Sequence, residues 1–287
     1  MHGVLVIDKP AGVSSAMAVE RVRRDLRIDR AGHGGTLDPL ATGVLAICVG
    51  AGTKLAQFLL ADDKAYEAEG LLGVETDTLD RTGRVISERP VHVTRDALLA
   101  VLGAHRGEQT QVPPMYSAIK QDGVRLYRLA RAGEQVERAP RPIRIDRLEL
   151  LAFEPPRFRI AIACSKGTYV RSLVADIGQA LGAGAHLTEL RRTRSGKFTI
   201  EQAVPLDRLA EATLIPPAQA TDLPSVTVPR ALVAQVHSGV QLPVTAFGAD
   251  GLARFQLVDE AGQLLAIAHP QAGRTVYDRG FPELTRA

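Results

Sequence analysis

The stretch from Gly32 to Leu45 packs four glycines, one histidine and one carboxylate into fourteen residues, the combination in this chain best suited to chemistry. Pro39 fixes its own φ and pushes the preceding residue, Asp38, away from helical dihedral angles. The pattern therefore predicts that Asp38 lies extended on a sharp turn, ahead of a buried strand at 44–49. A lone carboxylate on a rigid loop can act as a nucleophile or as a base.

The ordinary reading of the same residues is a turn, because Asp-Pro after a cluster of glycines is common in loops. Gly32 and Gly34 are not followed by glycine or alanine where a dinucleotide-binding fingerprint needs one, and no Walker lysine follows. The residues by themselves therefore favour an ordinary turn, and they match neither phosphate-binding motif.

The stretch 32–45 resembles, without a gap, the catalytic motif of the TruB-type tRNA pseudouridine synthases, which modify uridine-55 in the T-loop of tRNA. The resemblance implies that Asp38 is the catalytic aspartate, and that His33 enters the T-loop when the target nucleotide is turned out. It extends over most of residues 3–210, in separate blocks that follow the order of the family.

Two further side chains are candidates for the catalytic centre. Tyr66, in a Lys-x-Tyr sequence, matches the active-site tyrosine of the family, although a half-buried strand tyrosine is the commoner fate of such a residue. Arg171 lies near the predicted start of a helix at 170–181, where a cation is unfavourable with the helix dipole, so we expect an anionic partner. The resemblance implies that this partner is Asp38. The polar segment 76–83 matches a family turn motif and by itself indicates only a loop.

The candidate substrate-binding residues are His33, Tyr169, Leu190, Lys9, Arg191 and Arg192. Leu190 matches a leucine that lines the family's pocket. Arg191 and Arg192 open the densest basic cluster of the chain, which also contains Arg194 and Lys197 and suits contacts to phosphates. Lys9 lies in a turn that packs against the catalytic loop in the family, so we expect a structural role for this turn.

The segment from Gln111 to about Arg141 resembles the RNA-contacting insertion of the family. Basic residues alternate there with Tyr116 and Tyr127, as in an arm that orders on RNA. A plain surface excursion is the alternative. The arginines concerned are Arg125, Arg128, Arg131, Arg138 and Arg141.

The predicted fold class is α+β. Apolar periodicity predicts strands at 3–7, 64–68 and 158–164 and helices that begin near Ser14 and Thr94. The resemblance implies a mixed, mainly antiparallel sheet flanked by helices for a catalytic domain at 1–222, which contains the insertion. Prolines around 216 and 224 mark a linker, and residues 223–287 read as a small all-β unit, PUA-like by the resemblance.

Composition limits the possible partners. The net charge is only +3, so a nucleic-acid surface must come from clustered cations. Two cysteines without Cys-x-x-Cys or zinc-like spacing suggest a reducing compartment. Asp8 and Lys9 interrupt what would be the apolar core of a secretory signal, and no apolar run reaches the ~18 residues of a membrane span. We expect a cytoplasmic protein with tRNA as partner, through its T-arm stem-loop, and with no cofactor, metal, membrane contact or obligate protein partner.

The function implied by the resemblance is isomerisation of uridine to pseudouridine after base flipping. In this mechanism Arg171 keeps Asp38 ionised, Tyr66 stacks on the base and handles the C5 proton, and His33 fills the vacated place. Two other classes stay open at this point. A nucleic-acid glycosylase would use Asp38 with water, and a non-catalytic tRNA-binding or tRNA-folding protein would use only the basic arm and the β-rich tail.

Overall fold

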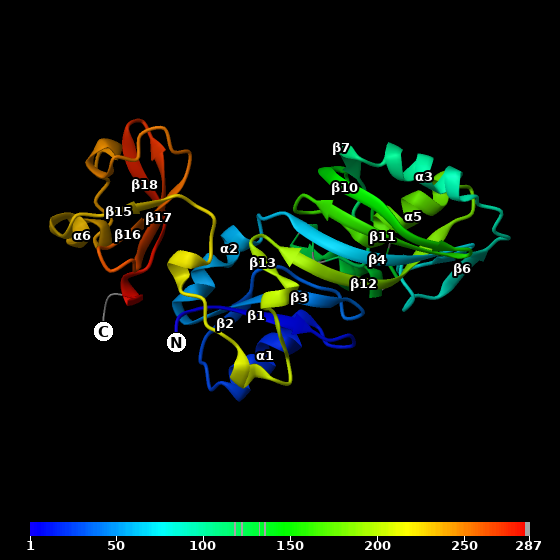
Figure 1. Ribbon diagram of the computed structural model, residues 1–287, viewed down its shortest axis with the longest axis horizontal. Helices are drawn as coiled ribbons and strands as arrows, with labels where there is room; N and C mark the ends of the chain where they lie inside the picture. The colour runs from blue at the N-terminus through cyan, green and yellow to red at the C-terminus, as the bar shows by residue number, and fades with distance from the viewer. Residues whose placement is uncertain (118, 122, 132, 135, 285–287) are drawn as a thin grey trace. The chain divides into compact units, whose positions relative to one another are not determined.

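The computed structural model describes residues 1–284 except 118, 122, 132 and 135 (Figure 1). The chain divides into two compact units, each built from more than one segment. Unit 1 comprises Met1–Asp38, Val44–Ala61 and Gly196–Ala287, and unit 2 comprises Pro39–Gly43 and Asp62–Ser195. The predicted domain boundary at 222/223 stays a prediction. The C-terminal strands belong to the same compact unit as the N-terminus.

Unit 1 contains strands from both ends of the chain. Its elements are β1 (Gly3–Lys9), α1 (Ser15–Asp25), β2 (Ala31–His33), β3 (Thr42–Val49, whose first two residues belong to unit 2), the 3₁₀ helix η1 (Gly50–Leu55), α2 (Ala56–Leu59), β13 (Phe198–Thr199), β14 (Val204–Pro205), β15 (Ser225–Thr227), α6 (Arg230–His237), β16 (Phe255–Val258), β17 (Leu264–Gln271) and β18 (Arg274–Gly280).

The C-terminal part of unit 1 is a sheet in the order β15-β16-β17-β18, as the all-β prediction for this region requires. Alternate residues of β16 and β17 point to two hydrophobic cores. One core includes Phe255 and Val236 of α6, and the other joins Ile267 to Val6 of β1 and Leu59 of α2. The C-terminal sheet is therefore packed on the N-terminal strands through shared apolar side chains.

Unit 2 contains the remaining α-helices and strands, whereas further short 3₁₀ helices lie within residues 200–284 of unit 1. The elements of unit 2 are β4 (Lys64–Leu72), β5 (Val74–Thr76), β6 (Val85–Glu88), α3 (Arg95–Ala104), β7 (Gly107–Gln111), β8 (Lys120–Gln121), β9 (Val124–Arg125), α4 (Leu126–Arg131), β10 (Arg141–Glu154), β11 (Arg157–Cys164), α5 (Val170–Ala180) and β12 (Ala185–Ser195).

Unit 2 is an antiparallel sheet in the order β12-β4-β11-β10-β7, and Figure 1 shows α3 and α5 together on one of its faces. The apolar side chains of β11, such as Phe158 and Ile160, alternate with exposed arginines, which puts the core on the helix side. The mixed, mainly antiparallel sheet with flanking helices confirms the predicted α+β class. Within the described residues, no helix is long and apolar enough to cross a membrane.

Candidate active site

Asp38 lies half-buried in the loop between β2 and β3, outside regular secondary structure. Ser15, at the start of α1, holds this loop through a buried hydroxyl. The hydroxyl accepts a hydrogen bond from the N–H of Leu37 at 2.8 Å and donates one to the Leu37 carbonyl at 2.9 Å. The residue next to Asp38 is thereby fixed to the start of α1, which gives the loop the rigidity that its sequence predicts.

The glycines on either side of Asp38 are required by close packing. A Cβ on Gly34 would lie 2.8 Å from the Leu59 Cβ. Gly43 has a φ of +102°, and a Cβ there would lie 2.2 Å from the carbonyl oxygen of Arg192, because β3 and β12 pair at this point. His33, the other candidate of the motif, is half-buried on β2 opposite Ile47.

Three candidate residues share one face of the unit 2 sheet. Residues directly opposite one another on neighbouring strands point to the same face. Tyr66 of β4 lies opposite Arg192 of β12, and Leu190 has the same orientation two residues earlier. Gly70, on the same side of β4 as Tyr66, packs against α5, since a Cβ there would lie 3.0 Å from Val174 Cγ1. Tyr66, Leu190 and Arg192 therefore lie on the face that α5 covers.

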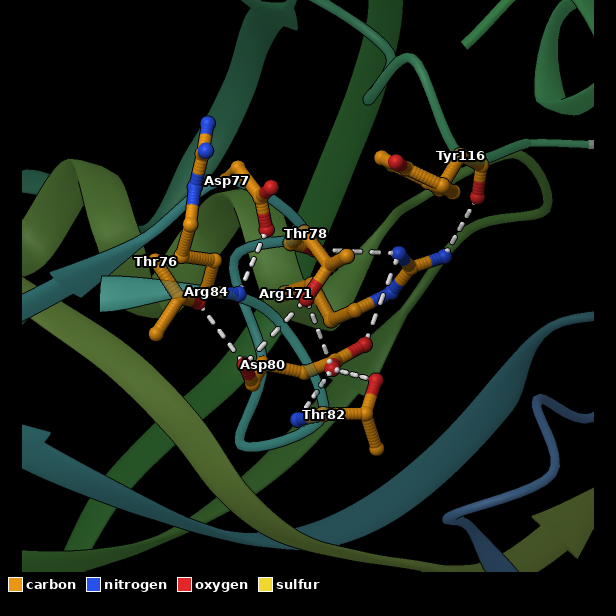
Figure 2. Close-up of polar contacts among 8 residues, drawn as sticks. All are labelled: Thr76, Asp77, Thr78, Asp80, Thr82, Arg84, Tyr116 and Arg171. Carbon is orange, nitrogen blue, oxygen red and sulfur yellow. Dashed lines mark hydrogen bonds and ion pairs between the residues drawn. The ribbon is translucent and has the colours of Figure 1, made fainter. Parts of the chain in front are cut away.

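Arg171, in the first turn of α5, is buried and points its guanidinium at the loop 77–84 between β5 and β6 (Figure 2). Its Nη1 donates to the carbonyl of Thr78 at 3.1 Å and lies 3.6 Å from Oδ2 of Asp80. Its Nη2 donates to the carbonyl of Tyr116 at 2.8 Å. Asp80 is thus an anionic partner of the kind that the position of Arg171 in the helix demands.

The loop around Asp80 is built to present this carboxylate. Asp80 Oδ1 accepts hydrogen bonds from the hydroxyl of Thr78 at 2.9 Å, the N–H of Thr82 at 2.9 Å and the hydroxyl of Thr82 at 2.5 Å (Figure 2). The other oxygen, Oδ2, faces Arg171. A Cβ on Gly83 would lie 2.3 Å from the Thr78 hydroxyl, so the threonines can converge on Asp80 only because residue 83 is glycine.

Sequence reasoning missed Asp80, because the segment 76–83 reads as an ordinary polar loop. The sequence did contain a signal. Arg171 was expected to have an anionic partner, and Asp80 lies in the segment 76–83, which matches a family turn motif. The pairing of Arg171 with Asp38, which the resemblance implies, stays a prediction.

The remaining candidates have distinct surroundings. Lys9 is fully buried, and its ammonium donates to the carbonyls of Pro10 at 2.8 Å and Val13 at 2.6 Å, which fits a structural role in the turn. Arg191 lies opposite Glu67, on the sheet face away from α5, whereas Arg192 is 2% exposed on the other face. The two arginines therefore do not form one continuous basic surface.

Lys64 also points to the α5 face, two residues before Tyr66 on β4. Its side chain is buried, and desolvation lowers the pKa of its ammonium to about 8, against a smaller opposing effect of Asp62. The ammonium donates to the carbonyl of Asp62. A lysine that is partly neutral near physiological pH thus lies beside the candidate tyrosine.

Tyr169 is the N-cap residue of α5. The side chain of Gln111 bonds to both its backbone N–H and its carbonyl. Farther along the insertion, Arg138 donates to the carbonyl of Pro113 at 2.9 Å. The side chains of Arg125, Tyr127, Arg128 and Arg131, which the sequence assigned to the RNA-contacting arm, lie outside the described residues.

Comparison with known proteins decides which family has this arrangement. Residues 23–170 match the N-terminal domain of the TruB family of pseudouridylate synthases, and residues 171–233 match a tRNA pseudouridylate synthase B C-terminal domain. The chain belongs to the TruB family. As a member of this family it is a pseudouridine synthase, an isomerase, and the resemblance noted in its sequence is confirmed.

Curated relatives agree with the family match. The chain is 56% identical to tRNA pseudouridine synthase B of Stutzerimonas stutzeri over 209 residues, which are 73% of this chain and 68% of that protein. It is 56% identical over the same length to tRNA pseudouridine synthase B of Aromatoleum aromaticum, with the same coverage of both chains.

Solved structures extend the likeness to nearly the whole chain. A chain of a Cbf5-Nop10-Gar1 complex superposes with a TM-score of 0.75 at 27% identity, covering 98% of this chain and 84% of that one. A chain of an H/ACA RNP bound to a substrate RNA containing 2'-deoxyuridine gives a TM-score of 0.73 at 25% identity, covering 98% and 85%. The pseudouridine-synthase fold predicted from the sequence is thereby confirmed, together with a separate C-terminal all-β sheet of the PUA-like kind.

Proposed function

We propose that this chain converts uridine-55 in the T-loop of cytoplasmic tRNA into pseudouridine, with Asp38 as the catalytic nucleophile or base. The observation that carries the proposal is the buried guanidinium of Arg171 at the start of α5, on the sheet face that also bears Tyr66 and Leu190. The names of the relatives, which are tRNA pseudouridine synthases B, support tRNA as the substrate.

The reaction breaks the bond between N1 of uracil and C1' of the ribose, rotates the base, and forms a bond from C5 to C1'. C5 loses its proton and N1 gains one, so uridine and pseudouridine are isomers. The detached base must stay bound, so the site needs one reacting carboxylate and a surface that holds the ring. Asp38 supplies the carboxylate on a clamped loop, four residues before the point where Thr42 pairs with β12. A guanidinium near that carboxylate favours its ionised form, which is the form that reacts.

The remaining roles follow from residue type and placement. Tyr66 stacks on the extruded base and handles the C5 proton, and Leu190 lines the wall against which the ring turns. His33 takes the vacated place in the T-loop and so lowers the cost of base extrusion, which is typically a few kcal/mol.

Mapping of pseudouridine in unmodified tRNA transcripts tests the proposed target. We expect modification at uridine-55 alone, equal modification of an isolated T-arm stem-loop, and none when position 55 is cytidine. Modification at another site, or failure on the isolated T-arm with success on intact tRNA, would contradict the proposed specificity. Release of free uracil would instead identify a glycosylase.

A further inference from the structure

The insertion from residue 111 to 141 leaves and rejoins the unit 2 sheet at one point. Gln111 is the last residue of β7, and its backbone lies directly opposite Arg141, the first residue of β10. All of the intervening chain therefore emerges between these two paired residues. Gln111 stands at the root of the insertion that the family resemblance assigns to RNA contact.

The side chain of Gln111 points from this root to the start of α5. Its Oε1 accepts a hydrogen bond from the N–H of Tyr169 at 2.8 Å, and its Nε2 donates to the Tyr169 carbonyl at 3.1 Å. Gln111 is 5% exposed, so both bonds are shielded from water. Tyr169 has no capping hydrogen bond from its own side chain. The carboxamide thus holds both polar groups of the residue that begins α5.

Two further hydrogen bonds join the first turn of α5 to the insertion. The hydroxyl of Ser172 donates to the carbonyl of Val112 at 3.3 Å, and Arg171 donates to the carbonyl of Tyr116 at 2.8 Å. The first turn of α5 is therefore attached to the first residues of the insertion by side chains from both segments. A shift of the insertion root would therefore displace the guanidinium of Arg171, because the two are joined through these contacts.

We propose that Gln111 is a positioning residue of the isomerisation. Gln111 fixes the N–H and the carbonyl of Tyr169 and so sets where α5 begins. The position of the Arg171 guanidinium therefore depends on Gln111, and through Gln111 on the position of the RNA-contacting insertion. The proposal rests on the proposed function of Arg171 at the reacting carboxylate. A shift of about 1 Å in a catalytic group can lower a rate by about a hundredfold, so loss of this anchor should be visible in the chemical step.

Gln109 supplies a matched control on the same strand and the same side of β7. Its Nε2 donates to the carbonyl of His105, at the C-terminal end of α3, at 2.6 Å. A Gln→Met substitution at either position removes an amide side chain that bonds to backbone, with little change in size. Only Q111M removes a bond to α5.

The first readout is the single-turnover rate of pseudouridine formation with enzyme in excess, measured beside the tRNA Kd and the Tm. We expect Q111M to lower the rate about tenfold or more, with the Kd within about threefold of wild type, and Q109M to leave both unchanged. A wild-type rate for Q111M would overturn the proposal. An equal loss of rate in Q109M, or a rate loss in Q111M that merely matches a loss of folded protein, would overturn it as well.

Gln111→Glu adds a readout that a merely structural role would not produce. A protonated carboxyl group can accept from the Tyr169 N–H and donate to its carbonyl, as the amide does, whereas the ionised form places a bare oxygen against that carbonyl. We expect the rate of Q111E relative to wild type to rise as the pH falls. A ratio independent of pH would contradict the proposal.

Hydrogen exchange separates failure of this proposal from failure of the proposed function. In the free protein, Q111M should exchange faster than wild type across residues 165–176, and Q109M should not. If exchange is faster but the wild-type protein modifies no tRNA, the anchor stands and the proposed function falls. If exchange is unchanged while wild-type protein is active, the anchor itself is refuted.

Discussion

The carboxylate of Asp80 lies 3.6 Å from the guanidinium of Arg171, and both side chains are 5% exposed. Such a pair is stable only when its other polar atoms are also satisfied, because desolvation of two charges is costly. Here Oδ1 of Asp80 accepts three hydrogen bonds from threonine groups, and Arg171 donates to two carbonyls. The loop 77–84 is thus a rigid mount for the one arginine that the family resemblance assigns to catalysis.

Asp80→Asn keeps the size of the side chain and an acceptor for the Thr82 N–H, but it removes the charge that faces Arg171. Removing one partner of a buried ion pair typically costs about 3–5 kcal/mol. We therefore expect D80N to lower the free energy of unfolding by about 3 kcal/mol and to lower the single-turnover rate. Asp77→Asn is the control, since Asp77 is exposed on the same loop and, in the contacts described, its carboxylate accepts only from the Arg84 N–H. Urea denaturation of both variants checks this, and equal stabilities would refute it.

Two neighbouring serines separate loop positioning from helix capping. Ser15→Ala removes both bonds to Leu37, whereas Ser14→Ala removes the cap on the Met17 N–H. We expect S14A to cost about 1 kcal/mol of stability with little loss of rate. S15A should slow pseudouridine formation at least tenfold, because the loop that carries Asp38 is released. Tm and single-turnover rate are measured for both variants. A slow S14A beside an S15A with the wild-type rate would contradict the role of Ser15 in holding the loop.

Glycine is required at 43 but not at 32. A Cβ on Gly43 would meet the backbone of Arg192 at 2.2 Å with φ at +102°, and no flexible side chain can move away to relieve the contact. A Cβ on Gly32 would have no other atom within 4 Å, and Gly32 has no left-handed φ. We expect G43A to lose several kcal/mol of stability, within the range of backbone strain and overpacking, and G32A to be nearly neutral. Thermal unfolding of the two variants tests this expectation, which a stable G43A would contradict.

The depressed pKa of Lys64 should appear in the pH dependence of stability. Between about pH 8, its pKa in the folded protein, and the ordinary lysine pKa of 10.5, the unfolded chain binds the proton and the folded protein does not. Stability therefore rises with pH in this window, by up to about 1.4 kcal/mol per pH unit for one proton. Below pH 8 both states are protonated, and this contribution no longer changes with pH.

The comparison that isolates Lys64 is wild type against Lys64→Met from pH 7 to 10. Burial raises the pKa of the Cys48 thiol to about 12 and that of Cys164 to about 11, and both effects lower stability as the pH rises. The effect of Cys48 is shared by the two proteins and cancels in the difference. The charge of Lys64 lowers the pKa of Cys164, which lies opposite it on β11, so the Cys164 effect cancels only in part. In urea unfolding, the free energy of unfolding of wild type minus that of K64M should increase above pH 8. Parallel curves would show that Lys64 keeps an ordinary pKa.

Local sequence patterns predicted most elements of the fold because their determinants lie within a few residues. The serine cap of α1, the threonine cap of α3 and the apolar alternation of β11 are examples. The motif around Asp38 likewise shows its glycines and its proline directly in the sequence.

Contacts between distant segments could not be derived in this way. Asp80 and Arg171 are 91 positions apart in the sequence, and Gln111 and Tyr169 are 58 apart. Each pair meets only in the folded protein, where the strand order β12-β4-β11-β10-β7 brings the two segments together. The alternation of side chains along β12 separates Arg191 from Arg192, which look like one basic cluster when the sequence is read linearly.

The measurement that bears most directly on the proposed mechanism is tritium release from tRNA carrying uridine labelled at C5, with Asp38→Asn beside wild type. Asparagine keeps the size of the side chain but is neither a nucleophile nor a base at neutral pH. We predict that wild type releases tritium stoichiometrically with pseudouridine, and that D38N releases none while binding tRNA with nearly unchanged affinity. Turnover by D38N at the wild-type rate would contradict the role of Asp38 and the account built on it.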